Sequence, residues 1–125
     1  MNDTSIDNDT SIDKVTLRVI GGAFDSIAKE MAHVLYRMSN SSIIRESEDI
    51  GCGIFDSTGQ ELCESETSPM HIGSLPFYIR GFMRKLEGKI FDGDIIIHNH
   101  PYYGASHTPD PVSYTHLTLP TRYRV

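Results

Sequence analysis

Apolar residues between Val15 and Met38 recur in alternating steps of three and four residues. This spacing places them on one face of an α-helix. Charged residues, including Lys29 and Arg37, occupy the opposite face. The pattern predicts one long amphipathic helix with a buried apolar stripe and an exposed polar side. The predicted stripe consists of Leu17, Ile20, Phe24, Ile27, Met31, Val34 or Leu35, and Met38.

Two short apolar segments, residues 50–55 and 61–64, flank the turn-forming residues 56–59. Strands on either side of a turn that ends in glycine predict a β-hairpin. Cys52 and Cys63 then lie on facing strands, either opposite each other or one residue apart. We expect two small buried hydrophobic side chains, and a cross-strand thiol pair is the alternative.

A second helix is predicted from Leu75-Pro76 to Gly88, because Ser74 can cap it and proline is tolerated in a first turn. Asp92-Gly93 then turns the chain into a short β-branched strand, residues 94–98, which leads into a His-rich loop. The order of long helix, hairpin, helix and strand predicts an α+β fold. The buried side of the second helix is assigned to Phe77, Phe82 or Met83, and Leu86.

The His-rich segment, residues 98–110, contains the densest candidate chemistry. Strand alternation puts His98 and His100 on one face, and His107 and Asp110 lie in the loop that follows. Imidazole nitrogen with carboxylate oxygen is a ligand set for zinc, manganese or iron. His107, Asp110 and His100 are therefore the candidate metal ligands, and no catalytic residue is assigned.

Each of these residues also has a structural interpretation. A histidine that ends a strand, such as His98, is commonly a solvated surface residue, and His107 with Asp110 could form only a strand-end turn. His71 fits a structural role better than a ligating one. Glu46 and Asp49 belong to a charged run that is typical of a solvated face, although either could line a pocket.

Composition narrows the classes of function. The chain has 125 residues, enough for one domain, and a net charge of -6 that gives it no electrostatic reason to bind nucleic acid. No apolar run approaches the roughly 20 residues of a membrane span, and no signal peptide is visible, so we expect a cytoplasmic protein. Phosphate-binding and dinucleotide motifs are absent, so any ATP must bind to another chain or domain.

The two ends of the chain differ from the middle. Residues 2–7 and 8–13 repeat the polar hexapeptide NDTSID, which predicts a disordered leader over residues 1–13. The segment VSYTHLTLPT after Asp110 reverse-translates into DNA that resembles a transposon-end adapter used in sequencing libraries. Residues 111–125 are therefore predicted to be a non-native tail that is unstructured or poorly packed against the rest, and whose removal leaves thermal stability almost unchanged. The alternative is a genuine strand rich in threonine, leucine and tyrosine.

Four blocks in the middle of the chain fall within residues 14–110: VTLRVIGGAFDSIAKEMAHVLYRMSNS, IRESEDIGCGIFDSTGQ, MHIGSLP and DGDIIIHNHPYYGASHTPD. Together, and in this order, they resemble the start of hydantoinase B/oxoprolinase subunits. The resemblance implies a hydantoinase A-type partner and the use of ATP, either to open cyclic amides such as hydantoin and 5-oxoproline or to carboxylate ketones. In the ketone-carboxylase branch, the resemblance also implies a metal site that begins with His107 and Asp110 and is completed by a downstream histidine.

One departure bears on the substrate. Many hydantoinase-type members have Asn-Asp-Pro where this chain has Asn99-His100-Pro101, which leans toward the acetone/acetophenone carboxylase branch. Three hypotheses follow: a piece of a cyclic-amide hydrolase subunit, a piece of a ketone carboxylase subunit, or a small non-catalytic interaction domain. In the first two, the chain is inactive alone and functions in a hetero-oligomer that holds ATP on the partner.

Overall fold

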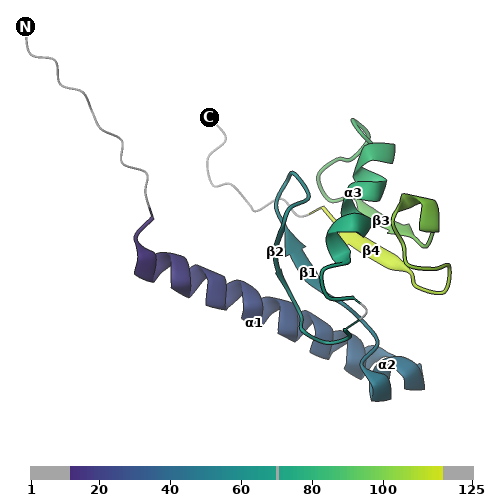
Figure 1. Ribbon diagram of the computed structural model, residues 1–125, viewed down its shortest axis with the longest axis horizontal. Helices are drawn as coiled ribbons and strands as arrows, with labels where there is room; N and C mark the ends of the chain where they lie inside the picture. Colours follow the sequence, from purple (N-terminus) through teal and green to yellow (C-terminus); the bar gives the residue numbers. More distant parts are fainter. Residues whose placement is uncertain (1–11, 70, 117–125) are drawn as a thin grey trace, which may run out of the picture.

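The computed structural model describes residues 12–69 and 71–116. Helices and small antiparallel strand pairs alternate along the chain (Figure 1), which confirms the predicted α+β class. The elements are α1 (Lys14–Met38), α2 (Ser42–Ser47), β1 (Gly53–Phe55), β2 (Glu61–Glu64), α3 (Leu75–Lys85), β3 (Ile95–His98), the 3-10 turn η1 (Pro101–Tyr103) and β4 (Val112–Thr115).

Helix α1 begins where the predicted leader ends. The first eleven residues of that leader lie outside the described residues, whereas Asp13 is the N-cap of α1. Its Oδ1 accepts hydrogen bonds from the backbone nitrogens of Val15 (2.9 Å) and Thr16 (3.0 Å). These bonds satisfy donors that have no partner inside the helix. The side-chain hydrogen bond from Thr16 is the main cause of a lowered Asp13 pKa.

The helix packs on a different face from the one predicted. Ala28 and Ala32 are buried, at 0% and 1% exposure, and α1 contacts the hairpin chiefly along β2. Most of the predicted stripe is exposed, from 38% at Ile20 to 74% at Met38, and Phe24 is half-buried. Two alanines four residues apart let the helix backbone approach the hairpin closely, and this contact turns the adjacent apolar stripe away. The predicted burial of the stripe is therefore wrong for every member except Phe24, which is half-buried.

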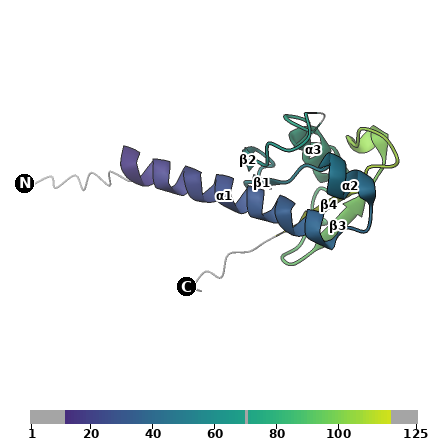
Figure 2. The ribbon, with the colours of Figure 1, turned by 90° about the horizontal axis from the view of Figure 1, so that it is seen from below.

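The first half of α1 extends beyond the rest of the fold (Figure 2). The two buried residues of α1, Ala28 and Ala32, lie in the second half. Although α1 has 25 residues, no helix in the described part of the chain is long and apolar enough to cross a membrane.

The predicted hairpin is confirmed. Strands β1 and β2 pair antiparallel, with Ile54 opposite Cys63 and an irregularity between Ile54 and Phe55. The turn is fixed by Asp56, whose Oδ1 accepts hydrogen bonds from the backbone nitrogens of Thr58 (2.8 Å) and Gln60 (2.9 Å). A carboxylate that bonds its own downstream backbone in this way is a common stabiliser of turns.

The two cysteines are farther apart in register than predicted. Cys63 faces Ile54, whereas the backbone nitrogen of Cys52 donates to Ser65 Oγ at 3.0 Å. The thiols are therefore offset by two positions rather than by one or none. Both are free and buried, and burial raises the pKa of each. The interpretation as small buried hydrophobes fits this arrangement.

Helix α3 begins at Leu75 as predicted but ends at Lys85, before Gly88. Its buried residues are Tyr78, Ile79, Gly81 and Phe82. The assignment of Phe77 to the buried side is wrong, since that side chain is 67% exposed. Ser74 occupies the N-cap position but makes no capping hydrogen bond, because its Oγ instead donates to the His71 carbonyl oxygen at 2.8 Å.

Strand β3 pairs antiparallel with β4, so that Ile96 faces Tyr114 and His98 faces Val112. The prediction that residues 111–125 are unstructured is therefore wrong for Val112–Thr115. Valine, tyrosine and threonine favour extended backbone, and alternation turns Val112 and Tyr114 toward the fold. The Tyr114 ring lies 5.0 Å from that of Phe82. Residues 117–125 lie outside the described residues, and the adapter origin stays a prediction.

A chain that ends at Asp110 should be less stable than the full chain. The cut removes the strand that pairs with β3 and the Tyr114 ring that packs on Phe82. A loss of even 1 kcal/mol lowers the Tm of a domain of this size by about 4–8 °C. Thermal unfolding followed by circular dichroism measures it. A Tm equal to that of the full chain would show that β4 contributes nothing.

Candidate functional site

The His-rich loop starts where β3 ends at His98 and continues through η1 to Asp110. Its return toward the strand is held by Asn99, whose Nδ2 donates to the Thr108 carbonyl oxygen at 2.7 Å. The backbone nitrogen of Gly104 donates to the Pro101 carbonyl oxygen at 3.0 Å, and Gly104 itself has φ 106°. Such a backbone conformation favours glycine.

Backbone contact with α3 fixes the loop in place. A Cβ on Gly81 would lie 1.7 Å from the Tyr103 carbonyl oxygen, and a Cβ on Gly104 would lie 2.4 Å from the Phe77 carbonyl oxygen. Neither position has room for a side chain. The two glycines thus let the helix and the turn pack backbone against backbone, which sets the distance of the loop from α3.

His107 and Asp110, two of the three candidate ligands, have side chains in direct contact. His107 Nδ1 lies 2.7 Å from Asp110 Oδ2, and the Asp110 backbone nitrogen donates to the His107 carbonyl oxygen at 3.1 Å. Ser106 Oγ hydrogen-bonds the same carboxylate oxygen and lies 3.1 Å from His107 Nδ1. The side chains of His107 and Asp110 are 53% and 25% exposed. One nitrogen and one carboxylate oxygen are therefore close together and accessible from solvent.

His100 does not join this pair. Its ring packs on the rings of Tyr103 and Tyr102, at centroid distances of 4.8 and 5.6 Å. Across residues 12–69 and 71–116, no three His, Cys, Asp or Glu side chains are placed to share one metal ion. Of the three candidate ligands, His107 and Asp110 thus form a pair, and His100 lies apart from them. Metal binding by these residues stays a prediction.

His98 is not the solvated surface residue that its place at a strand end suggests. Both ring nitrogens are buried and lack a hydrogen-bond partner, and the ring lies 5.6 Å from that of Phe82. Burial, and secondarily the charge of His100, lower the His98 pKa. The neutral imidazole is therefore the form that this apolar position favours.

His71 has the structural role that the sequence favoured. It is 8% exposed, and its Nε2 lies 3.4 Å from Asp49 Oδ1. Ser68 Oγ donates to the same oxygen at 3.1 Å. The sequence placed Asp49 in a solvated charge run, and no local pattern links it to a histidine 22 positions later. The pair ties the segment before β1 to the segment before α3.

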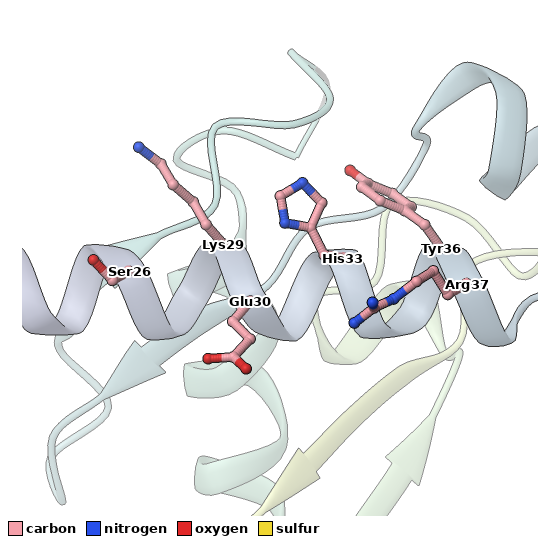
Figure 3. A pocket seen from close by; sticks show the side chains of 6 residues that line it. All are labelled: Ser26, Lys29, Glu30, His33, Tyr36 and Arg37. Carbon is pink, nitrogen blue, oxygen red and sulfur yellow. The ribbon is translucent and has the colours of Figure 1, made fainter.

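A surface hollow along α1 does not bring side chains together as the His107–Asp110 pair does. Its lining comes from a single helix, and Figure 3 shows Lys29 and His33 pointing to one side while Glu30 points to the other. Side chains that diverge in this way do not converge on one ligand atom. The lining residues are Ser26, Lys29, Glu30, His33, Tyr36 and Arg37.

The helix, hairpin and His-rich loop all fall inside one family match. Residues 13–118 match the model of the hydantoinase B/oxoprolinase family, so the chain belongs to that family. It is 50% identical over 103 residues to the B-type subunit of a D-/L-hydantoinase of Pseudomonas sp.. It is 35% identical over 99 residues to 5-oxoprolinase of Saccharomyces cerevisiae, and 31% identical over 104 residues to the beta subunit of caprolactamase of Pseudomonas jessenii. No solved structure matches the chain.

These relatives are much longer than the chain. The match to the hydantoinase subunit covers 79% of this chain but only 17% of that subunit. For the oxoprolinase the two shares are 79% and 8%, and for the caprolactamase subunit they are 83% and 18%. The site described above therefore corresponds to a small part of each relative.

Two helical glycines should respond in opposite ways to replacement by alanine. Gly81→Ala forces a methyl group into the Tyr103 carbonyl and should destabilise the fold by about 1–3 kcal/mol. Gly21→Ala, in α1, meets nothing within 4 Å and should stabilise it by roughly 0.5–1 kcal/mol. Urea unfolding of both variants measures the difference. Equal effects would mean that α3 and η1 are not in backbone contact.

Proposed function

We propose that the chain forms the N-terminal part of the B-type subunit of an ATP-dependent enzyme that hydrolyses a cyclic amide. The observation that carries this proposal is the family match together with the names of the relatives. Hydantoin, 5-oxoproline and caprolactam share one feature, an amide bond closed within a ring. The common reaction is then opening of that ring, and the substrate of this chain belongs to the same chemical class.

Within this subunit, we propose that His107 and Asp110 provide two ligands of a divalent ion such as zinc, manganese or iron. The donor set fits, because imidazole nitrogen and carboxylate oxygen both bind these ions. The 2.7 Å separation of Nδ1 and Oδ2 brings both donors to one place. Such an ion supplies a Lewis acid that polarises a carbonyl. A third protein ligand is expected from the downstream part of the subunit.

The neighbouring residues hold this pair in position. Ser106 Oγ bonds the Asp110 carboxylate and so directs it toward His107. The Asn99 bond to the Thr108 carbonyl oxygen joins the loop to the end of β3. Groups of this kind around metal ligands keep them oriented, and their loss weakens metal binding.

A ketone carboxylase is the second candidate. The observation that favours it is His100, which replaces the aspartate of many hydantoinase-type members and packs on Tyr103 beside the loop. In either enzyme we place ATP on a hydantoinase A-type partner subunit. We expect the 125-residue chain alone to be inactive, since it represents a small fraction of its relatives.

Metal content tests the assignment of the pair. The protein is a full-length chimaera in which residues 13–116 of this chain replace the matching part of the B-type hydantoinase subunit of Pseudomonas. After dialysis, elemental analysis should find zinc, manganese or iron in the chimaera and a clear loss in His107→Ala and in Asp110→Ala. His33→Ala, an exposed histidine on α1, is the matched control and should retain the metal.

Two results would contradict the assignment of the metal ligands: equal metal content in all four proteins, or the same loss of metal in the His33→Ala control.

The substrate is tested separately with the chimaera and its A-type partner. ATP hydrolysis stimulated by hydantoin or 5-oxoproline supports the cyclic-amide reaction. Stimulation only by a ketone with bicarbonate supports the carboxylase instead.

A further inference from the structure

Helix α1 carries a continuous apolar face that nothing in the described structure covers. We call it the α1 stripe. Successive members are three, four or seven positions apart, which places them on one side of the helix. Val34 and Leu35 are adjacent and lie at the two edges of that side. Each of them is exposed by more than a third of its surface. The α1 stripe consists of Ile20, Ile27, Met31, Val34, Leu35 and Met38.

The stripe lies next to the contact already made with the hairpin. Ala28 and Ala32 each immediately follow a stripe residue, Ile27 and Met31, and are buried against the fold. Lys29 is two positions from Met31, so helical geometry places the two side chains on roughly opposite sides of α1. Lys29 is exposed and points to the same side of the helix as His33 (Figure 3). The helix therefore has one small-residue face in contact, one large apolar face without contact and one charged face.

Uncovered apolar residues also occur on other elements. Ile95 and Ile97 occupy the outward face of β3, at 65% and 70% exposure, and Phe77 on α3 is 67% exposed. Large exposed apolar surfaces on a soluble protein mark places where another protein surface packs. A pairing of two α1 helices would cover the stripe alone and leave β3 and α3 uncovered.

We propose that the α1 stripe is the face on which the downstream part of the full-length B-type subunit packs, through a complementary apolar surface of the same polypeptide. The length of the relatives supports this occupant over a second copy. The chain accounts for 17% and 18% of the two bacterial subunits that it matches. The rest of such a subunit is large enough to cover faces on three separate elements at once. The inference rests on family membership and does not depend on the metal site.

Cysteine accessibility tests the proposal. Met31→Cys places a thiol in the α1 stripe, and Lys29→Cys places one on the opposite face two residues away. The native Cys52 and Cys63 are buried, and their reaction is subtracted with the unsubstituted protein. In the 125-residue chain, both new thiols should react with a maleimide at similar rates. In the full-length chimaera, the thiol of Met31→Cys should react at least about tenfold more slowly than in the 125-residue chain. The labelling rate of Lys29→Cys should be the same in both proteins.

Equal rates in the chimaera would overturn the proposal. Slow Met31→Cys labelling in the 125-residue chain that depends on protein concentration would assign the stripe to a second copy, and would also overturn it. If the chimaera does not fold, the same two thiols are placed at the aligned positions of the intact Pseudomonas protein, with the same expected results. The labelling rates depend on neither metal binding nor activity. A stripe that stays exposed in the chimaera would therefore contradict this inference and leave the proposed function untouched.

Discussion

The close approach of α3 to the turn η1 decides where the candidate chemistry lies. Gly81 and Gly104 stand where any side chain would collide with a carbonyl oxygen of the other segment, at 1.7 and 2.4 Å. This contact anchors the loop at its start, and the Asn99 bond to Thr108 anchors it near its end. His107 lies between these two anchors and Asp110 lies two residues after the second, and the two side chains meet at the solvent-facing side of the loop.

A second contact, equally dependent on small residues, joins α1 to the hairpin. Ala28 and Ala32 give the helix a close but narrow interface. No large side chain among the described residues is less than 2% exposed, so the core of this unit is thin. A thin core and a large uncovered apolar face have the same explanation in our account. Both are expected of one part of a larger subunit whose remaining surface completes the packing.

Sequence reasoning succeeded where a local pattern determines the structure. The hairpin followed from turn residues between apolar segments, and α3 followed from its Ser-Leu-Pro start. The sequence also placed His107 and Asp110 in one loop, where their side chains meet, and their binding of a metal stays a prediction. Helical periodicity located α1 but not its buried face, because it shows that a face is apolar and not what covers it. The buried residues turned out to be Ala28 and Ala32.

Longer-range features could not be found this way. The Asp49–His71 pair joins residues that no local pattern connects, and the close contact at Gly81 depends on a turn about 20 residues later. A strand after Asp110 was only the alternative hypothesis, because residues 111–125 were interpreted by their origin and not by their propensity, and Val112–Thr115 form that strand. Whatever its origin, a segment with strand-forming residues can pair with the free edge of β3.

Amide hydrogen exchange on the 125-residue chain tests the central claim that two small-residue contacts hold the unit while the first half of α1 stands uncovered. Amides of residues 78–82 and 28–36 should exchange slowly, since they lie at those contacts. Amides of residues 17–24 should exchange much faster, because that half of α1 has no packing partner to suppress local opening. Uniform slow exchange along the whole of α1 would contradict the account, as would fast exchange in α3.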